Sequence, residues 1–166
     1  MAETEGKRLD SEFKFRPESI AVVESTLYPN WYPGAIASIG DTDKVRGDLC
    51  LQSIAEGVQK GYHMIVADAD SSASFREELG RFPALTFVRR QEQARGAGRR
   101  QGFQVASAIP GVESIIRTEP EKVLIVKELI PKIMQPLLEG EADIVVPKRN
   151  LDLHQSTYPA YQWQSE

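Results

Sequence analysis

The sequence predicts an α/β fold in which helices cover both faces of a mostly parallel β-sheet. Short runs rich in β-branched residues alternate along the chain with longer segments of helical periodicity. Most of these runs are apolar at successive positions, which is typical of strands buried on both faces. The chain has 166 residues, of which 41% are hydrophobic and 27% are charged. That size and balance predict one domain over residues 1–166, in which residues 1–17 are extended or flexible and residues 150–166 form a C-terminal tail.

Five segments have the composition of strands, and a long segment of helical character separates the last two. The predicted strands are residues 19–25, 62–68, 84–90, 113–117 and 142–147. After the first strand, apolar side chains recur at helical spacing between Thr42, a suitable N-cap, and Gly61, a suitable stop. A short helix capped by Ser71 or Ser72 is expected before the third strand, and a further helix must end near Pro110.

Composition excludes several classes of function. A formal net charge of -4 and a pI near 5.3 argue against a nucleic-acid binder, whose surface normally carries a cationic excess. Cys50 is the only cysteine, which excludes an intramolecular disulfide and a thiolate metal site. The apolar runs are far shorter than the roughly 18 residues that span a bilayer, and the polar start has no signal-peptide core. We expect a cytoplasmic protein with no nucleic-acid partner and no membrane span, and self-association into a homo-oligomer stays open.

The residues that follow the predicted strands are polar. Because ligands bind at the carboxyl ends of the strands in open parallel sheets, we expect these residues to form one rim. A nucleotide diphosphate needs hydrogen-bond acceptors for its base and ribose, cations for its phosphates, and paired carboxylates for a divalent cation. The rim residues are Glu24, Ser25 and Thr26 after the first strand, Asp68, Asp70 and Ser71 after the second, Arg89, Arg90, Arg95, Arg99 and Arg100 after the third, and Arg117, Glu119 and Glu121 after the fourth.

The loop RGAGRRQG contains Gly96, Gly98 and Gly102 in a GxGxxxG spacing that is neither a Rossmann fingerprint nor a Walker loop. Glycines let backbone N–H groups approach an anion at a helix N-terminus, where Arg95 and Arg99 would add charge. The alternative is a turn whose arginines face water, and the spacing gives the two interpretations about equal weight.

Two acidic pairs each have a choice of roles. Asp68 and Asp70 form a D-x-D, which either serves a nucleotide and metal site or caps the next helix. In the stretch IIRTEPEKV, Glu119 and Glu121 are hard oxygen ligands of the kind that a divalent cation prefers. Thr118 and Glu121 also match the capping-box pattern T-x-x-E. Both roles are compatible, because phosphate also binds at helix N-termini.

Residues 128–149, ELIPKIMQPLLEGEADIVVPKR, resemble the corresponding segment of family 2 glycosyltransferases, especially the dolichyl-phosphate mannose synthase branch. VRRQEQARGAGRRQGFQVA is similar to the third-strand region of that family, and IVADADSS is similar to the second-strand region, whose aspartate contacts the nucleotide base. SIAVVESTLYP corresponds to the first strand, so the resemblance extends over residues 19–149.

The resemblance implies a GT-A-like fold, a three-layer sandwich with a mostly parallel sheet. It implies transfer of a sugar from a nucleotide-diphosphate sugar to an acceptor hydroxyl. The implied nucleotide-binding residues are Glu24, Thr26, Asp68, Asp70, Arg95, Gly96 and Arg99, and the implied ligands of a divalent cation, Mn or Mg, are Glu119 and Glu121.

Two departures from the family pattern support a second hypothesis. Glu-Pro-Glu at residues 119–121 replaces the family's Asp-x-Asp, and the chain ends at Glu166, before the region that usually supplies the acceptor site and a carboxylate base. An inverting transfer needs such a base to take the acceptor's proton. The alternative is therefore a non-catalytic GT-A-like domain that binds a nucleotide or a protein partner. The sequence assigns no catalytic residue, acceptor or sugar.

Overall fold

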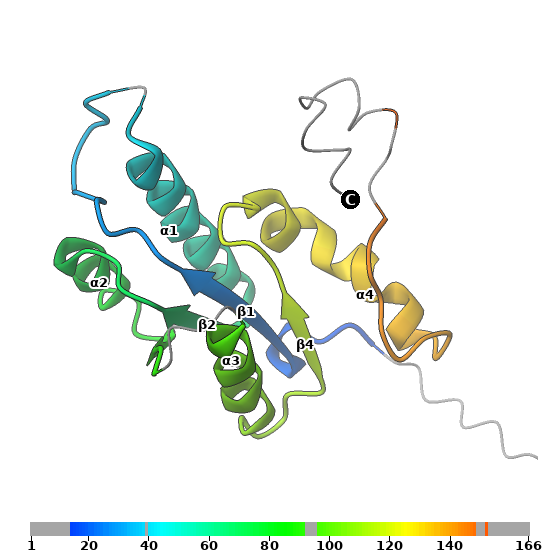
Figure 1. Ribbon diagram of the computed structural model, residues 1–166. Helices are drawn as coiled ribbons and strands as arrows, with labels where there is room; N and C mark the ends of the chain where they lie inside the picture. Colours follow the sequence, from blue (N-terminus) through cyan, green and yellow to red (C-terminus); the bar gives the residue numbers. More distant parts are fainter. Residues whose placement is uncertain (1–13, 39, 92–95, 149–151, 153–166) are drawn as a thin grey trace, which may run out of the picture. The chain divides into compact units, whose positions relative to one another are not determined.

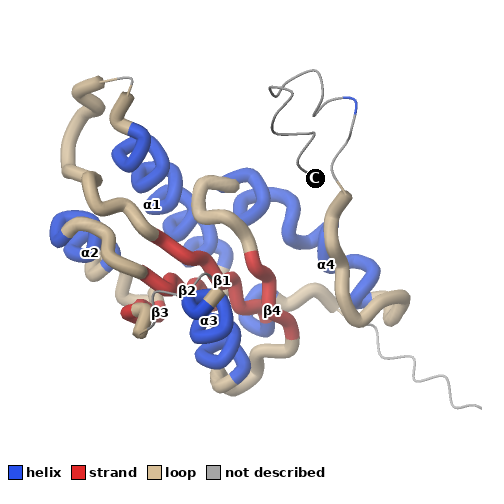
Figure 2. The backbone as a smooth tube through the Cα atoms, in the orientation of Figure 1, coloured by secondary structure: helices blue, strands red, loops and turns tan. Residues whose placement is uncertain are grey.

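A computed structural model describes residues 14–38, 40–91, 96–148 and 152, and it confirms the α/β prediction. Four strands form one parallel sheet in the order β3-β2-β1-β4 (Figures 1 and 2). Each strand lies within one or two residues of a predicted run. The strands are β1 (Ile20–Thr26), β2 (His63–Asp68), β3 (Thr86–Arg89) and β4 (Ser114–Arg117).

The chain divides into two units. Lys14–Ile130 contains the whole sheet and the helices that pack on it. The described residues 131–148 and 152 belong to the other unit, which holds most of helix α4 (Ile130–Leu138). Among the described residues, no helix combines the length and the hydropathy that a bilayer crossing demands. The first unit also contains α1 (Thr42–Lys60), α2 (Ala73–Leu79), α3 (Ala97–Ser107), a 3-10 turn η1 (Pro17–Ser19) and a π-helical turn η2 (Ile125–Leu129).

Helices cover both faces of the sheet in the first unit. In Figure 1, α3 lies in front of β1 and β2, and α1 lies behind them. Val23 of β1 and Ile65 of β2 are fully buried on the α3 face, where they pack with Ala106. Because successive side chains of a strand point to opposite faces, β1 must be apolar at neighbouring positions to serve both layers. This explains the unbroken apolar run by which the sequence identifies the strand.

Glycines let the helices approach the strands. A Cβ atom at Gly102 would lie 2.4 Å from Cγ1 of Val23, and one at Gly98 would lie 2.9 Å from Cδ of Arg90. Gly96 precedes α3 with a left-handed φ of 93°, which L-residues with a side chain rarely adopt. Gly102 therefore serves packing, Gly98 lies against the flexible end of the Arg90 side chain, and Gly96 serves the turn into α3.

Substituting Gly102 by alanine is expected to lower the free energy of unfolding by about 1–3 kcal/mol, because the added methyl group overpacks the contact between α3 and β1. Gly40→Ala is the matched control, since its Cβ would meet only Oγ of Ser38 at an ordinary 3.6 Å. Urea unfolding of both variants measures the effect. Equal stability of the two variants would show that α3 can shift away from β1 without cost.

Two helix ends follow the signals in the sequence. α1 ends at Gly61, which has a left-handed φ of 83°. The side chain of Ser72 caps α2 by accepting a hydrogen bond of 3.2 Å from the backbone N of Phe75. The N-cap of α1 is Asp41, one residue before the expected Thr42.

The capping box expected at Thr118 and Glu121 is not formed. Thr118 donates from Oγ1 to the carbonyl oxygen of Glu119 over 3.4 Å, and Glu121 lies in a turn. Helical residues begin only at Val123. A capping box requires the two side chains to bond to backbone N–H groups of one helical turn, and here no helix has started at these positions.

The strand predicted at residues 142–147 is wrong. These residues have no regular structure, and Ile144 and Val146 are 79% and 83% exposed. A β-branched run becomes a strand only when a neighbouring strand completes its hydrogen bonds, so propensity alone does not decide the outcome. Within the described residues, no strand pairs with this segment.

Candidate functional site

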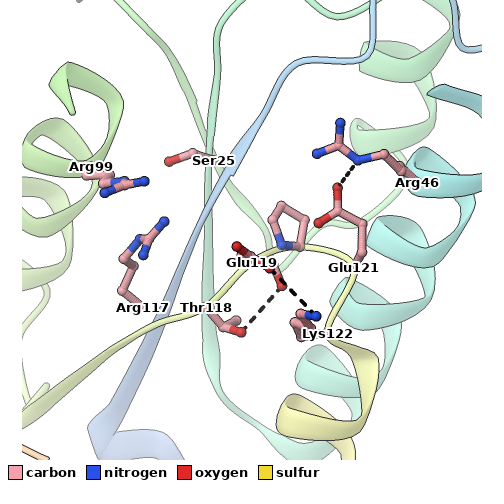
Figure 3. Close-up of a pocket in the computed structure, with 9 residues that line it drawn as sticks. Ser25, Arg46, Arg99, Arg117, Thr118, Glu119, Glu121 and Lys122 are labelled. Carbon is pink, nitrogen blue, oxygen red and sulfur yellow. Dashed lines mark hydrogen bonds and ion pairs between the residues drawn. The ribbon is translucent and has the colours of Figure 1, made fainter. Parts of the chain in front are cut away.

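A cleft opens at the carboxyl ends of β1 and β4, within the first unit (Figure 3). Its volume is about 460 Å³, within the usual range for pockets that bind small molecules. β1 contributes Ser25, α1 contributes Arg46 and α3 contributes Arg99, so three elements far apart in sequence meet here. The other lining residues are Arg117, Thr118, Glu119, Pro120, Glu121 and Lys122, from the end of β4 and the turn that follows.

Two guanidinium groups face each other across one side of the cleft. Figure 3 shows Arg99 and Arg117 with their side chains directed toward the same space beside Ser25. Partial burial lowers the pKa of Arg117 below its usual value, and the neighbouring charge of Arg99 lowers it further, while Glu119 opposes the shift. Within the described part of the chain, neither arginine forms a hydrogen bond or an ion pair. A pair of like charges held this way is stabilised by an anion placed between them.

The opposite side of the cleft is built around Glu121. Its Oε1 accepts hydrogen bonds from Nε of Arg46 at 2.6 Å and from the hydroxyl of Tyr28 at 2.9 Å. The guanidinium carbon of Arg46 also lies 5.4 Å from the ring centroid of Tyr28, close enough for a cation–π contact. Burial raises the pKa of the Tyr28 hydroxyl, and the nearby Cys50 and Glu121 add to the shift, so this hydroxyl is a donor at neutral pH. Glu121 is therefore fixed in place by two donors.

Glu119 is held less firmly than Glu121. Its Oε2 lies 3.8 Å from Nζ of Lys122, and the two side chains are 57% and 47% exposed. Such an exposed pair contributes little to stability, so Glu119 is free to rotate. The cleft as a whole contains four basic side chains and two acidic ones, which makes it cationic in a chain whose net charge is negative.

Asp68 organises the loops beside the cleft. It is fully buried, and its Oδ1 accepts from the hydroxyl of Thr26 at 2.8 Å and from the hydroxyl of Ser71 over a short distance. Its Oδ2 accepts from the backbone N of Ser71 at 3.2 Å. The backbone N of Tyr28 in turn donates to Oγ of Ser71 at 2.8 Å. These bonds tie the loop after β1 to the loop after β2 and so position Tyr28 for its contact with Glu121.

Glu24 packs against α1 and does not line the cleft. Its carboxyl group is fully buried, accepts from the hydroxyl of Ser53 at 2.7 Å and lies 3.9 Å from Sγ of Cys50. Burial raises the pKa of Glu24 to about 8, the charge of Glu121 adds to the shift, and the hydrogen bond from Ser53 opposes it. At neutral pH the group is mostly neutral, as a carboxyl group without a cationic partner must be in an apolar interior.

The structure brings together only some of the residues that the sequence predicts for this site. Arg99, Glu119 and Glu121 line the cleft, whereas Glu24, Thr26 and Asp68 are buried and do not line it. The side chain of Asp70 is 82% exposed and lies 3.5 Å from Arg76. Gly96 precedes α3 and does not line the cleft, and Arg95 lies outside the described residues.

Sequence reasoning missed Arg46 and Lys122. A signal for Arg46 was present, because the first turn of a helix that follows a strand lies at the carboxyl edge of a parallel sheet. Arg46 is the fifth residue of α1, directly after that turn, and Lys122 directly follows the Glu-Pro-Glu stretch. Basic residues in the first turns of the predicted helices would therefore have been the residues to examine.

Comparisons of this chain with protein-family models, curated proteins and solved structures give no match. The assignment of a function thus depends on the residues of the cleft and on the resemblance of short sequence segments.

Proposed function

We propose that the cleft binds a nucleotide-diphosphate sugar and that the chain is the donor-binding domain of a GT-A-like glycosyltransferase. The observation that carries the proposal is the pair Arg99 and Arg117, two guanidinium groups that face one space without an ion pair among the described residues. Guanidinium groups match phosphate oxygens in geometry and charge, so a diphosphate is a ligand that relieves their repulsion.

The position and size of the cleft support the same ligand class. Carboxyl ends of parallel strands are the usual place for nucleotides in open α/β sheets. A volume of about 460 Å³ suits part of a nucleotide sugar, with the remainder lying over the open mouth. Ser25 and Thr118 add hydroxyl groups that can hydrogen-bond to phosphate or ribose oxygens.

The proposed reaction requires the cleft to stabilise a leaving group. The acceptor oxygen forms a bond to the anomeric carbon of the sugar, the bond from that carbon to the phosphate oxygen breaks, and the electron pair stays on the departing nucleoside diphosphate. Arg99 and Arg117 would stabilise the negative charge that develops there. The acceptor's proton passes to a base, and no described residue of the cleft is assigned that role.

A non-catalytic nucleotide-binding domain is the second candidate. It is favoured by the pairing of both acidic side chains in the cleft, Glu121 with Arg46 and Glu119 with Lys122. A carboxylate whose oxygen already accepts from a cationic side chain is not placed to take the acceptor's proton. Release of free sugar from UDP-sugars and GDP-sugars distinguishes the candidates, because only the catalytic one accelerates slow transfer to water.

Isothermal titration calorimetry tests the binding itself. We expect UDP or GDP to bind more tightly than the corresponding monophosphate, since the second phosphoryl group supplies the additional charge that the arginines attract. Inorganic pyrophosphate is expected to compete. If nucleosides bind as tightly as nucleoside diphosphates, the cleft recognises something other than a diphosphate.

Arg117→Gln is expected to weaken binding of the nucleoside diphosphate about 10- to 100-fold, the usual range for losing charge-assisted hydrogen bonds to a phosphate. Arg81→Gln is the matched control, because Arg81 pairs with Glu78 on the surface and does not line the cleft. Calorimetry of both variants, with thermal unfolding to verify that each is folded, measures the difference. Equal affinities of the two variants would remove Arg117 from the site.

A further inference from the structure

We propose that arginine side chains, and not a divalent cation held by Glu119 and Glu121, neutralise the phosphate groups of the ligand. The inference rests on the proposed function, because it assumes that the ligand carries a diphosphate. It overturns the metal-binding role that the family resemblance implies for these two glutamates, and it gives Glu121 another role, as the anchor of Arg46.

Glu121 already binds two donors. Its Oε1 accepts hydrogen bonds from both Arg46 and Tyr28, and its side chain is only 17% exposed. A cation that took this oxygen would have to displace a charged donor and leave the hydroxyl of Tyr28 without its partner, and one that took the other oxygen, Oε2, would lie beside the guanidinium group of Arg46. Buried donors left without an acceptor are costly, so the existing pairing competes strongly with a metal.

The two glutamates are not arranged as a pair of metal ligands. In nucleotide sites Mg²⁺ is bound by one or two carboxylates together with phosphate oxygens and water, and Mn²⁺ prefers the same ligand type, so both carboxylates would have to point to one place. Within the described residues, no group of three or more His, Cys, Asp or Glu side chains is arranged to hold a metal ion. Glu119 faces Lys122, and Figure 3 shows Glu121 turned toward Arg46, so the two carboxylates have different partners.

The cleft is already cationic without a metal ion. A doubly charged cation placed between Glu119 and Glu121 would lie in a cleft that already contains Arg46, Arg99, Arg117 and Lys122. Its repulsion from these groups opposes binding before any phosphate arrives. The arginines supply the same neutralisation for phosphate oxygens and need no metal.

Glu121 holds Arg46 at the rim of the cleft. Its side chain is half-exposed, and without a partner such a side chain would sample many rotamers. The ion pair with Glu121 at 2.6 Å and the contact with the Tyr28 ring hold the guanidinium group at the rim of the cleft. Among the described residues, Arg46 is bonded to Glu121 through Nε alone. Its two terminal nitrogens are therefore able to donate to a ligand.

Calorimetry of UDP and GDP in EDTA, in Mg²⁺ and in Mn²⁺ tests the proposal directly. We expect the affinity of the bound nucleotide to agree within about threefold among the three conditions. Binding that appears only with Mg²⁺ or Mn²⁺ overturns the inference and leaves the proposed function standing. Absence of binding under all three conditions overturns both, so the two failures are distinguishable.

Glu121→Gln separates the anchor from the metal ligand. Glutamine can still accept from Tyr28 but no longer forms an ion pair with Arg46, so we expect binding to weaken about two- to fivefold, and by the same factor in EDTA and in Mn²⁺. Glu77→Gln on α2 is the control, since Glu77 is exposed and does not line the cleft. A loss of affinity confined to the Mn²⁺ titration would restore the metal-ligand role of Glu121.

Discussion

Replacing Glu24 by glutamine is expected to remove most of a pH dependence that the stability of the wild-type chain shows between about pH 4.5 and about pH 8. The pKa of this carboxyl group is raised in the folded chain from 4.5 to about 8, mainly by burial. Between these two pH values the folded state binds more protons than the unfolded state, so the free energy of unfolding falls as pH rises. Below this window the carboxyl group is protonated in both the folded and the unfolded state, so it does not make the stability depend on pH.

The size of the effect follows from the width of the window. Each unit of pKa difference corresponds to about 1.4 kcal/mol, so the wild-type chain should lose up to about 5 kcal/mol of stability across the window. Glutamine has nearly the same shape, still accepts a hydrogen bond from Ser53, and cannot ionise. The variant should therefore be close to wild type near pH 5 and several kcal/mol more stable near pH 8.5.

Urea unfolding at a series of pH values measures this prediction. Glu77→Gln serves as the control. Glu77 is exposed on α2, so its replacement should not change how the free energy of unfolding varies with pH. If the free energies of unfolding of Glu24→Gln and wild type change in parallel with pH, the Glu24 carboxylate is solvated or paired when it ionises.

Replacing Asp68 by alanine is expected to lower the free energy of unfolding by about 3–5 kcal/mol. Asp68 is the shared acceptor for the hydroxyls of Thr26 and Ser71 and for the backbone N of Ser71. All three donors belong to buried residues, and each buried donor left without an acceptor costs about 1–3 kcal/mol. The loss should also loosen Tyr28, whose backbone N donates to Ser71.

Asp68→Asn is the matched variant for this position. Asparagine keeps one oxygen acceptor, so it should retain part of the network and cost less than alanine, about 1–2 kcal/mol. Thermal and urea unfolding measure both variants. If alanine and asparagine are equally stable, the donors around Asp68 find other acceptors, and the loops after β1 and β2 are not held by this side chain.

Strands and helices of the first unit were predictable from local sequence because each carries its own signal. β1 is an unbroken apolar run, and α1 ends at Gly61, where a left-handed φ is needed. These signals are local because burial on two faces and backbone conformation constrain the residue type at each position directly. In the first unit, the four predicted strands consequently agree with the observed ones within one or two residues.

Residues 142–147 show where a local signal is insufficient. Ile144 and Val146 have high β-propensity, yet they are exposed and form no strand. A strand is defined by hydrogen bonds to a neighbour, and the presence of that neighbour is a property of the whole fold. The T-x-x-E pattern at Thr118 fails for a related reason, because the helix begins later and Glu121 finds its partners on other elements.

The sequence by itself determined the α/β class, the parallel order of alternating strands and helices, and the rim of polar residues at the strand ends. The tertiary structure alone decided which of those polar residues share a cleft. Asp68 and Glu24 lie at the ends of strands, as expected, but their side chains point into the interior and serve the fold. Arg46, Arg99 and Arg117 come from three separate elements, and only the packing of α1 and α3 on opposite faces of the sheet places their charges around one space. Charge convergence of this kind depends on distances between segments remote in sequence, which no local pattern encodes.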